Sequence, residues 1–197
     1  MPEAQTALAA QLAELVSEFR SRSNVEPLKQ HIQALARSAT PDALVVAAES
    51  YRDEPDIMAP LYEVVVEEQP NNARALVILA NAYWLLGFGP EAVGELANRA
   101  IAIDPANRGA WHLWALTESD PRQRVSRWRQ VVARFPQDDL ALVNVADNAA
   151  GVASNEQDYE MLDLAVSAYE SLLERADVPA QRDALDTALR ALRGWKF

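Results

Sequence analysis

A run of arginines that follows Pro121 contains the side chains in this sequence best suited to hold an anion. The candidates are Arg122, Arg124, Arg127 and Arg129, with Arg134 further along. A guanidinium group can bond two oxygens at once, so this set predicts a patch for an acidic peptide, a phosphate or an RNA backbone. The alternative is a solvated helix face whose arginines pair with nearby acids such as Asp138 and Asp139, which is common on protein surfaces.

Catalytic chemistry has little support in the remaining polar residues. The chain has no cysteine and two histidines. His112 lies beside Trp111, where an imidazole can bond a ligand or titrate, but the sequence places no acid or nucleophile next to it. Adjacent acids such as Glu67 and Glu68 diverge on a helix and do not converge on one metal ion. We therefore expect no catalytic residue, no metal and no cofactor.

The overall charge opposes binding to nucleic acid. Lysine and arginine total 18 against 29 aspartates and glutamates, which gives a net charge of −11. Phosphate repulsion would have to be overcome by a local patch, so a nucleic-acid partner is disfavoured. No apolar run reaches the roughly 18 residues that a membrane-spanning helix needs, and the sequence does not open with a basic segment and an apolar stretch. We expect a cytoplasmic protein without membrane insertion.

A hydrophobic signature repeats along the chain and sets the frame for these side chains. It consists of a large residue, an apolar residue three positions on, and a residue directly after it that is alanine in all but the faintest copy. The copies begin at Leu44, Leu76, Trp111 and Leu142, with a fainter copy at Leu12. These offsets lie on one face of a helix, and a period in the low thirties is typical of stacked helical hairpins. The sequence therefore predicts an all-α chain of repeated hairpins.

Prolines mark the ends of the predicted helices. Thr40-Pro41, for example, pairs a capping side chain with a proline at the first helical position. We expect Pro60 in the first turn of its helix and a long polar loop at 151–158. The expected helices are 3–21, 26–37, 41–52, 57–68, 73–86, 90–103, 107–118, 121–134, 139–150, 158–176 and 179–194.

The segment from 73 to 105 carries the clearest copy of the repeat. Its apolar and small residues are Leu76, Leu79, Ala80, Tyr83, Ala92, Leu96 and Ala100, followed by Asp104-Pro105. This pattern resembles the tetratricopeptide repeat (TPR) family, well over 41–176 and weakly over 3–37. The resemblance implies an α-solenoid of about five antiparallel hairpins, wound as a right-handed superhelix. It also implies a divergent or capping hairpin at 1–37, four repeats at 38–178 and a C-terminal capping helix at 179–197.

In the family that this chain resembles, the first helices of the hairpins line a concave groove for partner peptides or proteins. The residues at the matching offsets are therefore expected to contact a partner. They are Val45, Glu49, Arg52, Val77, Asn81, Trp84, His112, Leu116, Asn144 and Asp147. Their alternative is to pack against the neighbouring repeat. No lysine lies between Lys29 and Lys196, so a lysine clamp for the carboxylate of a chaperone tail is not expected.

Three functions compete at this point. The leading hypothesis is a non-catalytic protein-interaction module, an adaptor, scaffold or assembly factor that binds a peptide or helix in the groove. A second hypothesis is a structural scaffold that assembles with itself through the N-terminal hairpin. A third is an RNA- or phosphate-binding protein that uses the arginine helix, which the net charge of the chain disfavours.

Overall fold

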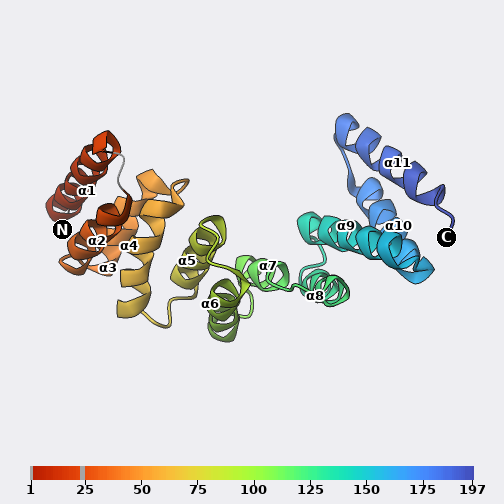
Figure 1. Cartoon of the computed structure of the whole chain (residues 1–197), viewed down its shortest axis with the longest axis horizontal. Coiled ribbons are helices and arrows are strands. Elements are labelled where there is room, and N and C mark those ends of the chain that lie inside the picture. Colours follow the sequence, from red (N-terminus) through yellow and green to blue (C-terminus); the bar gives the residue numbers. More distant parts are fainter. Residues whose placement is uncertain (1, 23–24) are drawn as a thin grey trace. The chain divides into compact units, whose positions relative to one another are not determined.

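The computed structural model describes the backbone of residues 2–22 and 25–197 and the side chains of residues 6–20 and 28–197. Within these ranges every regular element is a helix (Figure 1). The helices are α1 (Pro2–Arg22), α2 (Val25–Arg37), α3 (Pro41–Ala48), α4 (Pro55–Glu68), α5 (Ala73–Leu85), α6 (Pro90–Ile103), α7 (Arg108–Leu116), α8 (Pro121–Arg134), α9 (Asp139–Glu156), α10 (Tyr159–Arg175) and α11 (Pro179–Arg193). A short 3₁₀ helix, Glu49–Tyr51, follows α3. The predicted all-α solenoid class is confirmed.

The chain divides into two compact units, Met1–Leu113 and Trp114–Phe197. In the first unit α1 packs on α3, α2 packs on α4, and α5 packs on both α4 and α6. In the second unit α9 packs on both α8 and α10, and α11 packs on α10. Neighbouring helices therefore cover one another's apolar faces within each unit, which is how a repeat array builds its core.

The repeated signature is the buried face of these helices. Its members in α3, α5 and α9 are at most 8 % exposed. They are Leu44, Ala47 and Ala48, then Leu76, Leu79 and Ala80, then Leu142, Val145 and Ala146. Burial of each large side chain contributes about 1.5–3 kcal/mol, and each alanine lets the facing helix approach closely. The copy in α7 differs, because Trp111 and Trp114 are only half-buried.

Capping side chains begin the helices where the sequence predicts. The Thr40 hydroxyl accepts a hydrogen bond from the Ala43 N–H at 3.4 Å, and Pro41 occupies the first helical position of α3. The Asp120 carboxylate accepts one from the Gln123 N–H at 2.8 Å at the start of α8. Each contact satisfies a backbone donor that has no partner inside the helix, so the proline and capping signals fix the register of the array.

The expectation for Pro60 is wrong. Helix α4 begins at Pro55, so Pro60 is the sixth residue of the helix and lies beyond its first turn. A proline has no N–H, and this position therefore gives no hydrogen bond to the carbonyl of Asp56. Pro60 is nevertheless buried along with most residues of α4. Packing on both sides of the helix holds it in place despite the missing bond.

The expected long loop at 151–158 is also wrong. Helix α9 continues to Glu156, and Gln157 ends it in the left-handed conformation with φ 56°. Val152 and Ala153 are buried in a cluster with Leu162 and Ala165 of α10. The apolar period of α9 thus runs past Gly151, and the gain from burial exceeds the modest helix penalty of one glycine.

The end of α9 gives a stability prediction. A non-glycine residue in the left-handed region costs about 1–2 kcal/mol, so Gln157→Gly should raise the free energy of unfolding by about 0.5–1 kcal/mol after the entropy cost of glycine. Ser154→Gly, at an exposed position inside the same helix, is the matched control and should lower it slightly. Urea denaturation followed by circular dichroism measures both. A loss of stability in Gln157→Gly would contradict the assigned helix end.

Candidate functional site

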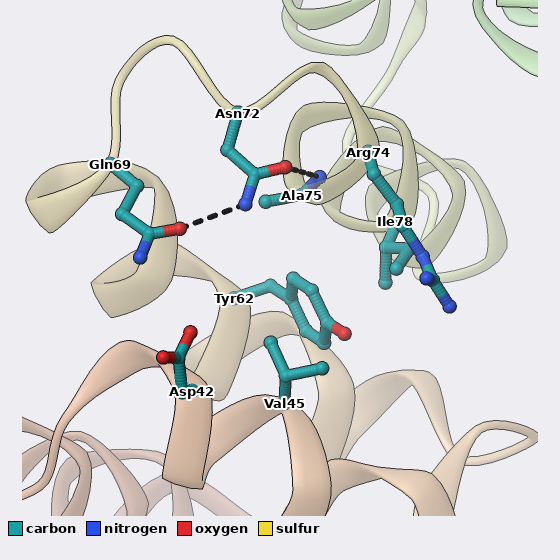
Figure 2. Close-up of a pocket in the computed structure, with 8 residues that line it drawn as sticks. All are labelled: Asp42, Val45, Tyr62, Gln69, Asn72, Arg74, Ala75 and Ile78. Atoms are coloured by element: carbon teal, nitrogen blue, oxygen red, sulfur yellow. Dashed lines mark hydrogen bonds between the residues drawn. The ribbon is translucent and has the colours of Figure 1, made fainter.

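Two adjoining hollows in the first unit lie between α3, α4 and α5. Their volumes are about 230 Å³ and 360 Å³, and they share Tyr62, Arg74 and Ile78 as lining residues. Helix α3 lines one side and α5 the other (Figure 2). The hollows bring together five of the predicted partner contacts. These are Val45, Glu49, Arg52, Val77 and Asn81.

Tyr62 forms the floor of both hollows. The residue is 4 % exposed and lies between Val45 of α3 and Arg74 and Ile78 of α5 (Figure 2). Burial raises the pKa of the Tyr62 phenol; the Arg74 guanidinium opposes this rise, and the Glu49 carboxylate adds to it. The phenol therefore keeps its proton at neutral pH and is available as a hydrogen-bond donor.

Charged and amide groups surround this floor. Glu49 and Arg52 form an ion pair with each other at the surface. Arg74 and Asn81 are exposed on α5, and within the described residues neither forms a side-chain hydrogen bond or ion pair. Nearby, Asn72 caps α5 by accepting from the Ala75 N–H at 3.0 Å (Figure 2). The hollows thus combine an apolar floor with polar groups that a ligand can reach.

The remaining predicted contacts do not line these hollows. In the second unit the Asn144 amide donates to the carbonyl of Leu140 at 2.8 Å, and the Asp147 carboxylate accepts a hydrogen bond from the Tyr169 hydroxyl. Both side chains are therefore engaged within their own unit. Trp84 is 39 % exposed, and it precedes Leu85, Leu86 and Phe88, which are exposed too. His112 and Leu116 are half-buried on α7.

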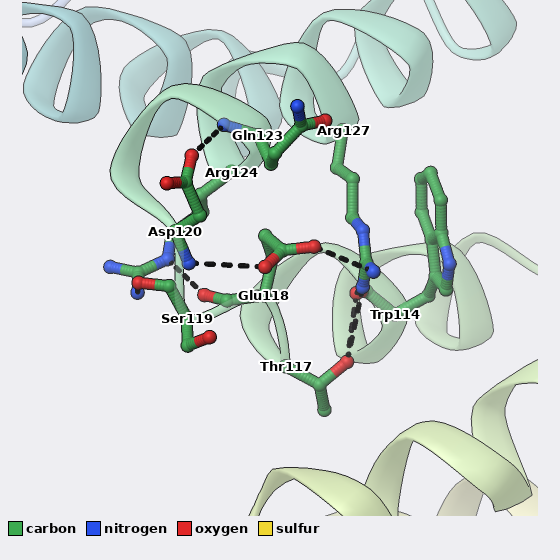
Figure 3. A network of polar contacts seen from close by, with 8 residues as sticks. All are labelled: Trp114, Thr117, Glu118, Ser119, Asp120, Gln123, Arg124 and Arg127. Atoms are coloured by element: carbon green, nitrogen blue, oxygen red, sulfur yellow. Dashed lines mark hydrogen bonds and ion pairs between the residues drawn. The ribbon is translucent and has the colours of Figure 1, made fainter.

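Two of the four predicted anion-binding arginines form hydrogen bonds with backbone carbonyls at or just beyond the C-terminal end of α7 (Figure 3). Arg124 donates to the carbonyls of Glu118 at 2.6 Å and Ser119 at 3.2 Å. Arg127 donates to the carbonyl of Trp114 at 2.8 Å, pairs with the Glu118 carboxylate at 2.7 Å, and lies 4.7 Å from the centre of the Trp114 ring. Cations that bond the last carbonyls of a helix are stabilising, so these side chains hold the α7–α8 turn.

Arg122 and Arg129 differ in their surroundings. Arg122 pairs with Glu156 at 2.7 Å and with Asp158, and its guanidinium lowers the pKa of the Asp158 carboxyl. Arg129 is exposed and has no ion pair with any described residue. The expected partner Asp139 pairs instead with Arg175 of α10 at 3.1 Å. Of the four candidates, Arg129 therefore keeps the free guanidinium that the anion hypothesis requires.

Sequence reasoning missed the Glu63 network, which ties three helices together. The Glu63 carboxylate accepts from the Tyr83 hydroxyl at 2.7 Å, from Lys29 at 3.2 Å and from Gln33 at 2.5 Å. Burial and the Glu63 carboxylate both raise the pKa of the Tyr83 phenol. Lys29 and Glu63 are 34 residues apart, and so are Arg122 and Glu156. A search for opposite charges one repeat apart would have found both pairs.

The described residues contain no group of three or more histidines, cysteines, aspartates or glutamates placed to hold a metal ion. In the same part of the chain no helix is long and apolar enough to cross a membrane. The groups that converge are those around Tyr62, and their chemistry is hydrogen bonding and apolar contact. They suit recognition of a ligand.

Comparison of the sequence with protein families and with curated proteins finds no match. Solved structures do resemble the fold. MamA aligns over 87 % of this chain and 98 % of its own, with 15 % identity and a TM-score of 0.59. TTC0263, a thermophilic TPR protein in Thermus thermophilus, aligns over 92 % and 98 %, with 15 % identity and a TM-score of 0.58. PilF of Pseudomonas aeruginosa aligns over 98 % and 95 %, with 15 % identity and a TM-score of 0.54. These matches confirm the TPR resemblance at the level of the fold.

The arginine contacts give a prediction with an internal control. Arg127→Gln removes a charged hydrogen bond and an ion pair at the end of α7, so we expect it to lower the free energy of unfolding by about 1–2 kcal/mol. Arg129→Gln, on the exposed side of the same helix, should change it by less than about 0.5 kcal/mol. Urea denaturation followed by tryptophan fluorescence compares them. A change for Arg127→Gln as small as the one expected for Arg129→Gln would show that the Arg127 contacts do not stabilise this turn.

Proposed function

We propose that this chain is a non-catalytic protein-interaction module, an adaptor, scaffold or assembly factor, that binds a peptide or helical segment over Tyr62. The observation that carries this proposal is the pair of adjoining hollows that α3 and α5 form above α4. Five residues predicted as partner contacts line them, and they come from helices in consecutive repeats. A ligand placed there would contact both repeats at once.

The chemistry of the lining supports a peptide ligand. Val45, Val77 and Ile78 offer apolar contact on both walls, and side chains buried in such hollows supply most of the affinity at peptide interfaces. Asn81 offers both a donor and an acceptor, the pair that a peptide backbone needs. The proposed partner contacts in this groove are therefore Val45, Glu49, Arg52, Val77 and Asn81.

The RNA- or phosphate-binding alternative has less support. Arg122, Arg124 and Arg127 are engaged with acids or backbone carbonyls of the second unit. The net charge of −11 also repels any polyanion over a long range, which disfavours its binding. A phosphate bound by these three arginines would have to displace existing contacts, and of the four candidates only Arg129 has no side-chain hydrogen bond or ion pair with the described residues, so we favour the peptide groove.

We also propose the division of the chain into a divergent or capping hairpin at 1–37, four repeats at 38–178 and a cap at 179–197. Helix α11 has the two faces that a cap needs. Its buried residues are Leu185, Leu189 and Leu192, and its exposed charged residues include Arg182, Asp186, Arg190 and Arg193. Terminal repeats with a polar outer face keep such arrays soluble.

The groove proposal is tested by two neighbouring valines of α3. Val45 lines a hollow, whereas Val46 is 49 % exposed and lines neither one. Peptides are first selected on the full chain from a random library displayed on phage and then resynthesised. Val45→Glu places a charge in the groove and should weaken their binding at least about tenfold, and Val46→Glu should not.

Isothermal titration calorimetry gives the affinities, and circular dichroism verifies that both variants are folded. Selection that yields no peptide, or equal weakening by both substitutions, would overturn the groove proposal.

A further inference from the structure

The Tyr62 hydroxyl is a polar group without an internal partner at the bottom of the groove. The residue is 4 % exposed, yet its hydroxyl makes no hydrogen bond to any residue that the structure describes. The hydroxyl can bond water in the hollow, and a ligand acceptor placed there would replace that water. The hydroxyl opens onto both hollows, so a ligand group that enters them can make this bond.

The Arg74 guanidinium is a second hydrogen-bond donor at this point. It lines the same two hollows as Tyr62, on the side of α5 (Figure 2). Arg74 is exposed and forms no ion pair with the acids that the structure describes. A guanidinium only donates hydrogen bonds, and the protonated phenol donates one too. Both groups therefore offer donors to a ligand acceptor, and the charge of Arg74 favours an anionic one.

Two acids also face this region and have to be weighed against an anionic ligand. Glu49 lines the larger hollow, but its carboxylate is paired with Arg52. Asp42 lines the smaller hollow and, like Arg74, is exposed, so water screens both charges. With Glu49 neutralised by Arg52, the positive charge that lines both hollows and lacks an ion pair among the described residues is that of Arg74.

We propose that the hollow over Tyr62 receives an aspartate or glutamate side chain of the bound peptide, whose carboxylate accepts hydrogen bonds from the Tyr62 hydroxyl and the Arg74 guanidinium. This inference rests on the proposed peptide groove and defines what the groove selects. Val45 and Ile78 flank the site, so the acid is expected between apolar residues of the peptide. A lysine at that position would meet Arg74 with the same charge, and an amide would leave the Arg74 charge uncompensated.

The experiment uses the peptides selected on the full chain. We expect them to share an aspartate or glutamate flanked by apolar residues. Changing that acid to its amide should weaken binding to the wild-type chain about tenfold, because a charge-assisted hydrogen bond is lost. Tyr62→Phe keeps the buried ring and removes the hydroxyl alone, and Arg74→Gln removes the charge. Each should weaken the acidic peptide about tenfold.

A double-mutant cycle makes the test specific. A peptide with alanine in place of the acid lacks the acceptor and should bind wild type, Tyr62→Phe and Arg74→Gln with similar affinity, because the interaction that each substitution removes is already absent. Arg37→Gln, at an exposed arginine that lines neither hollow, is the charge control and should bind both peptides as wild type does. Thermal unfolding of each variant verifies the fold.

The outcomes separate this inference from the groove proposal. Two results would overturn the carboxylate site and leave the groove intact. In the first, Val45→Glu weakens binding of the selected peptides, but the peptides share no acid. In the second, they share an acid that shows no coupling to Tyr62 and Arg74. Failure to select any peptide overturns both proposals. Coupling of the acid to Tyr62 and Arg74, together with unchanged binding to Arg37→Gln, supports the site.

Discussion

No hairpin of this chain can bury its apolar face alone, and this constraint governs the rest of the structure. Leu44, Ala47 and Ala48 of α3 are buried because α1 and α4 cover them, and α5 is covered in turn by α4 and α6. Small residues at the closest approach let the helices meet without voids. The groove follows from the same stacking, because α3 and α5 both pack on α4 and Tyr62 of α4 lies between them.

The polar contacts serve this stacking more than they prepare a surface for ligands. Arg124 and Arg127 satisfy carbonyls where the short helix α7 ends, and the Glu63 network joins α2, α4 and α5. Isolated surface ion pairs contribute little to the stability of the fold. Hydrogen bonds to partly buried backbone carbonyls contribute more, because they offset the cost of removing those carbonyls from water. The groups around Tyr62 are different, since Arg74 and the hydroxyl have no such structural use within the described residues.

The sequence predicted those features of the fold that depend on local periodicity, namely the buried helix faces and the helix starts. The offsets of the signature identified the buried faces, and capping residues such as Thr40 and Asp120 marked helix starts. The end of α9 differs from the predicted loop at 151–158, because Val152 and Ala153 continue the apolar face of the helix beyond Gly151. Tyr62 was missed for another reason. It lies on the second helix of a hairpin, and only the packing of α3 and α5 makes it line a hollow.

The central claim is that the surface over Tyr62 is where this chain binds its partner. Amide NMR of the full chain, recorded with and without a peptide selected on it, tests this claim without any substitution. The account predicts that the largest shifts fall on α3 and α5, at Val45, Ile78 and Asn81, with a shift of the Arg74 side-chain resonance. Shifts confined to α8, or to the exposed segment from Trp84 to Phe88, would contradict it.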